Sequence, residues 1–391
     1  MPVVRETLGD SSALDAAWSD PRTFAYLPEK TDVREEWVAS ALAALPEELR
    51  SGHFALLTSG STGHPKLVVG ERARAERLAR TLHAVQDSDP VAETILTLPL
   101  SYCYAFVNQW LWARVSGRRL VSTRGFSAPD LLRGALEGAS DAMLCFVGAQ
   151  VTLLERNFPD LVFPGVLRIH FAGGGFPQAE LGRLAAHFPN ARVFNNYGCA
   201  EAMPRLTSRR AEDAREATDV GRPLPGIELS LGEGAELFFR SPFGATAFYE
   251  QDELHLLSAD DWIATGDLAE RTEAGTWRLL GRANQVFKRY GEKIALARLL
   301  DTVATAWAGQ ANFYRERDRM QEEGFCLLLT PAPAEEDVRA VLKAFRAAHP
   351  RTHWPLRVES VPELPVLPNG KTDLAALATL VGKTIHWKNR L

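Results

Sequence analysis

Short apolar runs alternate with helical patterns through the first half of the chain. Ala75, Leu78, Leu82 and Val85 recur at helical spacing, which places them on one face of a helix that follows an apolar run. The alternation predicts an α/β core, because each buried strand is followed by an amphipathic helix that can cover it. The runs that we expect to form buried strands are "HFALLTS", "DAMLCFV", "VLRIHFAGGG" and "ARVFNNYG".

The pattern changes near residue 220, where β-rich runs with glycine turns replace the alternation. The stretches "GIELSLGEGAELFFRSP" and "IATGDLAERTEAGTWRLLGR" each predict a hairpin. Further on, "GFCLLLT" predicts a strand, and Val338, Val341, Leu342 and Phe345 mark an amphipathic helix. We therefore expect a large N-terminal domain, residues 1–283, of mixed sheets and helices with a β-rich subdomain. A small α+β domain would occupy residues 284–391.

Composition and charge narrow the class of protein. The 391 residues are 46% hydrophobic and 24% charged, with a net charge of −5, which is ordinary for a globular chain. No basic stripe indicates nucleic acid, no apolar run reaches the roughly 18 residues of a membrane span, and the start lacks the pattern of a signal peptide. The four cysteines form no C-x-x-C pair, so we expect no thiolate metal site and a reducing, cytoplasmic setting.

The stretch "LLTSGSTGHPKLVVG", from Leu56 to Gly70, carries the first sign of chemistry. Glycines and hydroxyl residues let backbone N–H groups converge on an anion, and Lys66 adds a positive charge at the exit. The simpler alternative is a Gly/Ser turn between two elements. A second phosphate-like stretch, "PVLPNGKT", has Pro365 where a nucleotide-binding P-loop requires glycine, so we do not interpret it as one.

Several motifs in a fixed order carry a resemblance to a known family. "TSGSTGHPK" resembles the phosphate loop of the adenylate-forming superfamily, which includes acyl- and aryl-CoA synthetases, aryl-acid adenylation enzymes, peptide-synthetase adenylation domains and luciferases. The similarity extends from about Phe54 to Leu374. The later motifs follow in the family's order: "FAGGGFP", "NNYGCAE", "DVGRPLPGIEL", "AELFFRSP", "ATGDLAE", "GRANQVFKRYGEKI" and "LPNGKTDL".

The resemblance implies that ATP and Mg²⁺ are the cofactors and assigns roles to named residues. Lys371 would bridge the substrate carboxylate and the α-phosphate, and Glu201 would act beside it as the Mg²⁺ ligand. Asp267 would bind the ribose, helped by Arg282, and Tyr197 would stack on the adenine. The other ATP- or AMP-binding residues implied by the resemblance are Thr58, Ser59, Gly60, Ser61, Thr62, Gly63 and Lys66 at the phosphates, and Gly173, Gly174, Gly175, Asn196 and Gly198 around the nucleotide.

The resemblance places the acid pocket at "PLSYCYAF", with Tyr102, Cys103 and Tyr104 beside Gly174. No acidic residue lies between Pro99 and Trp112, whereas amino-acid-activating domains carry an aspartate in this region to pair with an α-ammonium group. We therefore expect an aryl or acyl acid without an α-amino group, because an unpaired ammonium would be costly to desolvate. The alternative is that these aromatic rings only pack the core.

The activity implied by the resemblance has two steps. ATP converts a carboxylic acid to acyl-AMP with release of pyrophosphate, and the acyl group then passes to a thiol of a carrier protein or CoA. Transfer to an amine and a non-catalytic nucleotide- or carrier-binding role stay open, as does a homodimer.

The resemblance also implies rotation of the small domain and a shortened first domain. Rotation of the small domain would turn on Asn284 and involve Lys288 and Gly291. Because only 55 residues precede Leu56, we also expect a shortened first domain.

Overall fold

The computed structural model describes residues 1–59, 65–86, 88–214, 216–283, 286–290, 292–365 and 372–389. The chain divides into two compact units. The first comprises Met1–Gly232, Leu237–Thr265 and Arg271–Arg278, and the second comprises Glu233–Glu236, Gly266–Glu270 and Leu279–Leu391. The expected boundary at residue 284 stays a prediction, because residues 284 and 285 lie outside the described residues.

A mixed six-stranded sheet in the first unit begins at the N-terminus and ends with a hairpin from later in the chain. Its order is β1-β2-β3-β4-β14-β15, with β1, β2 and β3 parallel and the remaining pairs antiparallel. The inner strands are apolar and buried, and α2 (Glu35–Ala43) packs its buried residues into the same core. The strands are β1 (Val3–Arg5), β2 (Phe24–Leu27), β3 (His53–Ser59), β4 (Pro65–Glu71), β14 (Ala247–Glu250) and β15 (Glu253–Leu256).

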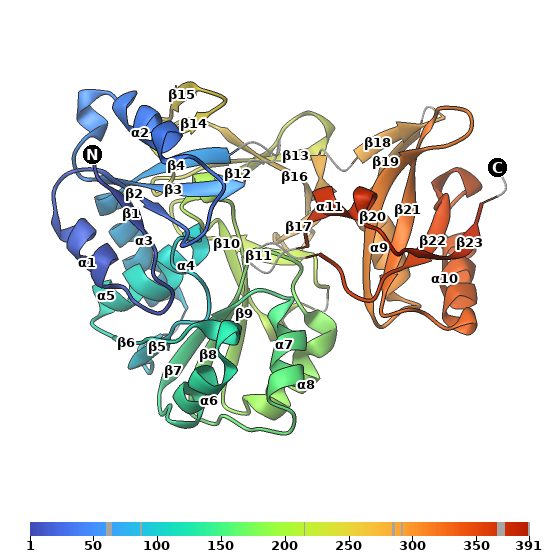
Figure 1. Ribbon diagram of the computed structural model, residues 1–391, viewed down its shortest axis with the longest axis horizontal. Helices are drawn as coiled ribbons and strands as arrows, with labels where there is room; N and C mark the ends of the chain where they lie inside the picture. The colour runs from blue at the N-terminus through green and yellow to red at the C-terminus, as the bar shows by residue number, and fades with distance from the viewer. Residues whose placement is uncertain are drawn as a thin grey trace. The chain divides into compact units, whose positions relative to one another are not determined.

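A second sheet contains the parallel strands that the apolar runs predict. Strands β5, β7, β8 and β9 are parallel neighbours, and Figure 1 shows α6, α7 and α8 beside them. Leucines and phenylalanines of these strands and helices form one buried cluster, so the predicted α/β class is confirmed. In order across the sheet, the strands are β12 (Glu228–Leu231), β13 (Glu236–Arg240), β16 (Ile263–Arg271), β17 (Trp277–Arg282), β11 (Asp219–Pro223), β10 (Thr207–Arg210), β9 (Arg192–Tyr197), β8 (Val166–Phe171), β7 (Ala142–Phe146), β5 (Glu93–Ile95) and β6 (Arg119–Val121).

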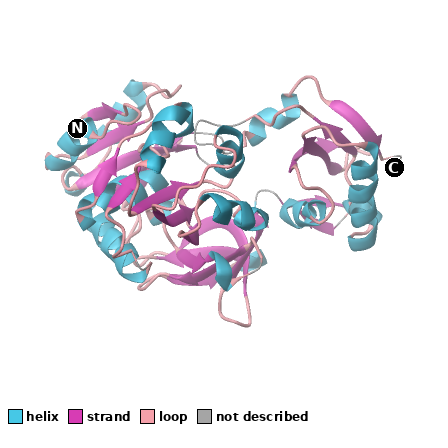
Figure 2. Cartoon of the chain, turned by 90° about the horizontal axis from the view of Figure 1, so that it is seen from below, coloured by secondary structure: helices cyan, strands magenta, loops and turns pink. Residues whose placement is uncertain are grey.

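Helices lie beside the strands of the first unit, as Figure 2 shows. The helix predicted from the 75–85 pattern is α3, and Ala75, Leu78 and Leu82 are buried in it. Val85 continues this face at the last residue of the helix, where it is 44% exposed because it lies beyond the core that the earlier turns contact. The helices are α1 (Ser12–Ser19), α2, α3 (Arg72–Val85), α4 (Cys103–Ala105), α5 (Trp112–Ser116), α6 (Pro129–Glu137), α7 (Gln150–Asn157) and α8 (Leu181–His187).

A π-helical turn, Phe106–Leu111, joins α4 to α5 and lies among buried aromatic side chains. Phe106 stacks on Phe54 of β3 with 4.7 Å between ring centroids, and Trp110 meets Trp18 of α1 at 5.1 Å. Such turns are uncommon and often lie at functional sites. Here the turn immediately follows the segment predicted to line the acid pocket.

The second unit has its own sheet and core. Four strands in the order β20-β21-β22-β23 carry α9 (Leu296–Ala304) and α10 (Glu335–Ala348), and the predicted strand and amphipathic helix correspond to β21 and α10. Val338, Val341, Leu342 and Phe345 of α10 are buried, as the pattern predicts. The elements after β17 are β18 (Val286–Arg289), β19 (Glu292–Ala295), β20 (Gln310–Arg317), β21 (Glu323–Thr330), β22 (Arg357–Ser360), α11 (Leu374–Thr379) and β23 (Thr384–Lys388).

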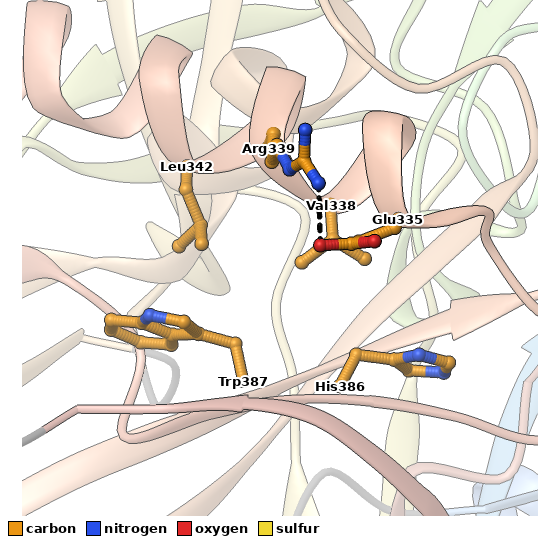
Figure 3. A pocket seen from close by; sticks show the side chains of 6 residues that line it. All are labelled: Glu335, Val338, Arg339, Leu342, His386 and Trp387. Carbon is orange, nitrogen blue, oxygen red and sulfur yellow. Dashed lines mark hydrogen bonds and ion pairs between the residues drawn. The ribbon is translucent and has the colours of Figure 1, made fainter.

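A cavity of about 210 Å³ in this unit lies between α10 and β23. Figure 3 shows Leu342 and Val338 facing Trp387 across it, with the Glu335–Arg339 ion pair at one side. The sequence predicts no site residue here. Within the described parts of the chain, every helix is too short or too polar to cross a membrane.

Glu6, at the end of β1, fixes the loop that leads into α4. Its buried carboxylate accepts hydrogen bonds from the backbone N–H groups of Leu100 and Ser101, and from the Ser101 hydroxyl at 2.5 Å. Gln109 holds the other end of this loop, because its Oε1 accepts from the Thr97 N–H at 2.8 Å. Burial raises the pKa of Glu6, although its hydrogen bonds to Ser101 and Leu100 lower it.

We expect Glu6→Gln to lower the free energy of unfolding by about 2 kcal/mol, because an amide nitrogen would meet buried N–H donors. Since burial raises the pKa of Glu6, the folded protein binds a proton that the unfolded chain releases, and the carboxyl stabilises most below its unfolded pKa. The loss should therefore shrink as the pH rises above about 4.5. Urea unfolding at several pH values tests this, with Glu36→Gln on the exposed side of α2 as the control. Equal urea midpoints for Glu6→Gln and Glu36→Gln would contradict this stabilising role of Glu6.

Candidate functional site

The ammonium group of Lys66 lies between two carboxylates. Lys66, on β4, is directly opposite Glu250 on β14, and its Nζ is 3.3 Å from the Glu250 Oε2. The Nζ is also 3.0 Å from the Oε1 of Glu201, a residue 135 positions further along the chain. The structure thus brings together the predicted phosphate-binding lysine and the predicted metal-binding glutamate.

This three-residue cluster, Lys66–Glu201–Glu250, is largely removed from water. The side chains are 13%, 20% and 15% exposed in that order. Burial alone disfavours the ammonium ion, but attraction to Glu201 and Glu250 outweighs it and raises the pKa of Lys66. The ring of Phe248, two residues before Glu250 on the same strand face, lies 4.3 Å from the Nζ and adds a cation–π contact. Lys66 therefore stays charged at any ordinary pH.

Close backbone packing carries Glu201 to this position. The chain leaves β9 at Tyr197, and a Cβ on Gly198 would lie 1.9 Å from the carbonyl oxygen of Pro204. Only glycine lets these two segments approach so closely. The following 3₁₀ turn, Ala200–Ala202, contains Glu201, and the Glu201 carbonyl accepts a hydrogen bond from the Ala245 N–H at 2.8 Å.

Asn196, beside the predicted adenine-stacking Tyr197, is a hub of buried hydrogen bonds. Its Oδ1 accepts from Gln86 at 2.8 Å and from Arg205 at 2.5 Å, and its Nδ2 donates to the Phe171 carbonyl at 3.0 Å. The side chain is 3% exposed and faces the interior. It holds the end of β9 against the end of β8, and its own contact with a nucleotide stays a prediction.

The predicted adenine-binding turn follows β8. Gly173 has a φ of +79°, which only glycine adopts without strain. A Cβ on Gly174 or Gly175 would meet no atom within 4 Å, so open space adjoins the backbone at both positions. This geometry suits a flat ligand lying against the chain.

Asp267 and Arg282, the predicted ribose-binding residues, form an ion pair in the second unit. The Arg282 Nε lies 2.8 Å from the Asp267 Oδ1, across the neighbouring strands β16 and β17. The carboxylate side chain is only 10% exposed, while the guanidinium is 45% exposed. The structure thus places the two residues side by side, and their contact with a ribose stays a prediction.

The predicted pocket residues lie at the start of the helical segment. Cys103 is buried, and burial together with the Glu201 charge raises the pKa of its thiol. Tyr102 and Tyr104 meet edge to face at 6.1 Å, and the Tyr104 hydroxyl donates to the His170 carbonyl at 2.7 Å. Tyr104 therefore faces the protein interior, as the core-packing alternative expects.

Several predicted residues lie outside the described parts of the chain. They are Gly60, Ser61, Thr62 and Gly63 of the phosphate loop, the hinge residue Asn284, Gly291, and Lys371. The structure describes the backbone of Ser59 in β3 and of Lys288 in β18 but not their side chains. Thr58, the first residue of the predicted phosphate loop, lies opposite Lys66 in the β3–β4 ladder.

Sequence reasoning missed Glu250, Phe248 and Glu6. Glu250 ends the short strand "AFYE", and nothing in this local sequence indicates that it lies opposite Lys66. Glu6 contacts residues about 95 positions away. The strand register reveals the position of Glu250, and the tertiary hydrogen bonds reveal that of Glu6.

Comparison with known proteins gives one family model, several sequence relatives and solved structures of similar fold. The sequence profile of a family described as AMP-binding enzyme matches residues 11–237, more than half of the chain. The chain is 24% identical over 351 residues to the non-ribosomal peptide synthetase CmlP of Streptomyces venezuelae, covering 84% of this chain and 34% of that protein. It is 27% identical over 354 residues to the 2-hydroxy-7-methoxy-5-methyl-1-naphthoate–CoA ligase of Streptomyces carzinostaticus, covering 84% of this chain and 62% of that one.

A solved structure shares the fold. The O-succinylbenzoate coenzyme A synthetase MenE of Bacillus subtilis, in complex with AMP, superimposes with a TM-score of 0.73 at 16% identity. The match covers 96% of this chain and 87% of that structure. By contrast, the chain spans less than two thirds of the length of either sequence relative named above.

Replacing Gly198 should destabilise the fold, because a methyl group would collide with the Pro204 carbonyl oxygen. We expect Gly198→Ala to lower the free energy of unfolding by about 2 kcal/mol or more. Gly182→Ala, on the exposed surface of α8 where the added Cβ meets nothing within 4 Å, is the control and should be neutral or slightly stabilising. Urea unfolding measures both, and an unchanged midpoint for Gly198→Ala would argue against the close packing.

Proposed function

The chain belongs to the AMP-binding enzyme family, and from that premise we propose that it activates a carboxylic acid with ATP. The products of this step are acyl-AMP and pyrophosphate, and the acyl group then passes to a thiol. The observation that carries the proposal is the 3.0 Å contact between Lys66 and Glu201, which brings the predicted phosphate and metal ligands to one place.

The cluster fits a magnesium ion that arrives with its nucleotide. Mg²⁺ is usually held by one or two carboxylates together with substrate phosphates and water, not by a protein cage. Glu201 supplies such a carboxylate, and the described residues contain no group of three or more His, Cys, Asp or Glu side chains that could form a cage. Bound there, the ion would neutralise phosphate charge, while Lys66 would contact the β- and γ-phosphates.

Other residues would orient the nucleotide and the acid. The open backbone at Gly174 and Gly175 would lie against the adenine, and Asp267 would accept hydrogen bonds from the ribose. Lys371 would stabilise the charge that builds on the α-phosphate as the carboxylate attacks. Because the reacting groups are both anions, this positive charge is the main catalytic requirement.

We propose an aryl or acyl acid without an α-amino group as substrate. The segment from Pro99 to Trp112 carries no carboxylate to pair with an ammonium group. The sequence likeness to a naphthoate–CoA ligase supports an aryl acid. Likeness to both a CoA ligase and a carrier-linked peptide synthetase leaves both thiol acceptors as outcomes of the product test.

Pyrophosphate exchange tests the first step. We expect acid-dependent incorporation of labelled pyrophosphate into ATP with at least one member of a panel of aromatic and aliphatic acids. Lys371→Ala should slow this exchange about a hundredfold, because one charge-assisted transition-state contact is worth about 3 kcal/mol. Lys343→Ala, exposed on α10, is the control. Exchange at an undiminished rate in Lys371→Ala would remove that residue from the mechanism.

Product analysis tests the second step. With an active acid, we expect mass spectrometry to detect a thioester on CoA or on a phosphopantetheinylated carrier protein. An amide formed with simple amines, and no thioester, would instead identify an amide ligase. The absence of exchange with every acid would favour the non-catalytic alternative.

A further inference from the structure

Glu250 has no role in the function described so far, yet it contacts the charged group that this function needs. Its Oε2 is 3.3 Å from the Lys66 Nζ, and Glu201 approaches the same nitrogen at 3.0 Å. Two carboxylates and one ammonium give the cluster a net charge of −1. A polyphosphate entering here would meet excess negative charge unless a cation accompanied it.

The two carboxylates are held in different ways. Glu250 and Lys66 are a cross-strand pair in the β4–β14 ladder, which also pairs Ala247 with Val69 and Phe248 with Val68. Glu201 reaches Lys66 from a single 3₁₀ turn of three residues. Since a ladder fixes its side chains more firmly than one turn does, Glu250 is the carboxylate better placed to stay with Lys66.

Phe248 completes the surroundings of the ammonium group. It projects from the same face of β14 as Glu250, and its ring centroid is 4.3 Å from the Nζ. A ring face and one carboxylate are enough to hold the ammonium in place without Glu201. Glu201 can then leave Lys66 without stranding a buried charge.

We propose that Glu250 is a positioning residue that retains Lys66 when Glu201 turns from the lysine to Mg²⁺. The proposal rests on the proposed function, since it assigns the order in which one cluster receives metal and phosphate. With Glu250 present, the Glu201–Lys66 contact is one of two and can open. Without it, Lys66 and Glu201 form a closed pair, and the metal must compete with the lysine for the carboxylate.

The test follows the Mg²⁺ requirement of nucleotide binding, which needs no turnover. Calorimetric titration of ATP at a series of Mg²⁺ concentrations gives the Mg²⁺ concentration for half-maximal affinity. We expect Glu250→Gln to raise this concentration about tenfold, within the range of coupling between groups in contact. Glu253→Gln is the matched control, because Glu253 lies opposite Glu250 on β15 but is 78% exposed. It should leave the requirement unchanged.

A double-mutant cycle separates positioning from a simple loss of negative charge near the metal. If Glu250 acts through Lys66, the shift caused by Glu250→Gln should disappear in a Lys66→Met background. A shift of the same size in that background, or no shift in Glu250→Gln alone, overturns the proposal. Lys66→Gln provides a second background if Lys66→Met unfolds, and thermal unfolding checks each variant.

The outcome is independent of catalysis. If no acid supports pyrophosphate exchange in the wild-type protein, the proposed function fails, but the binding titrations still decide the role of Glu250. If wild-type protein exchanges pyrophosphate and Glu250→Gln keeps the wild-type Mg²⁺ requirement, only the positioning role fails.

Discussion

The ammonium group of Lys66, largely removed from water, links the two sheets of the first unit. Lys66 lies on β4 and Glu250 on β14 of the six-stranded sheet, while Glu201 follows β9 of the other sheet. Charges withdrawn from water must be paired, so the contact fixes how the end of β9 meets the strand that leaves the phosphate loop. The geometry of the candidate site is thereby a consequence of charge pairing as much as of backbone topology.

The interior behind this contact is more polar than its apolar strands suggest. Arg205 is fully buried, and it donates to the amide oxygens of Asn108 and Asn196, both at 2.5 Å. Burial lowers the pKa of Arg205 to about 10, so the guanidinium still carries its charge at neutral pH. Burial likewise lowers the pKa of His170, whose neutral ring stacks on Phe194 at 4.9 Å. Through these contacts, Arg205 and His170 stabilise the ends of β8 and β9, next to the motif residues Tyr197 and Gly198.

Local patterns predicted the elements well, and they could not predict contacts between distant parts of the chain. The buried strands β7, β8 and β9 and the helix α10 follow from periodicity, because each residue's environment repeats along its own element. The helix α3 followed too, with Val85 exposed at its last turn. The motif order indicated Lys66 and Glu201 as site residues. Neither source could reveal Glu6 or Glu250, since their roles depend on strand register and on partners far away in sequence.

Because a π-helical turn joins α4 to α5, deleting one residue there would change the direction in which the preceding side chains point. In a π-helical turn each hydrogen bond joins residues five apart instead of four, so this segment contains one residue more than a regular α-helix would. Losing that residue would restore a regular helix and rotate everything before it by roughly 100° relative to Trp112. Tyr102 and Cys103 would then exchange places with their neighbours around the helix axis. A single-residue deletion here would therefore turn Tyr102 and Cys103 in a new direction without any substitution in this segment.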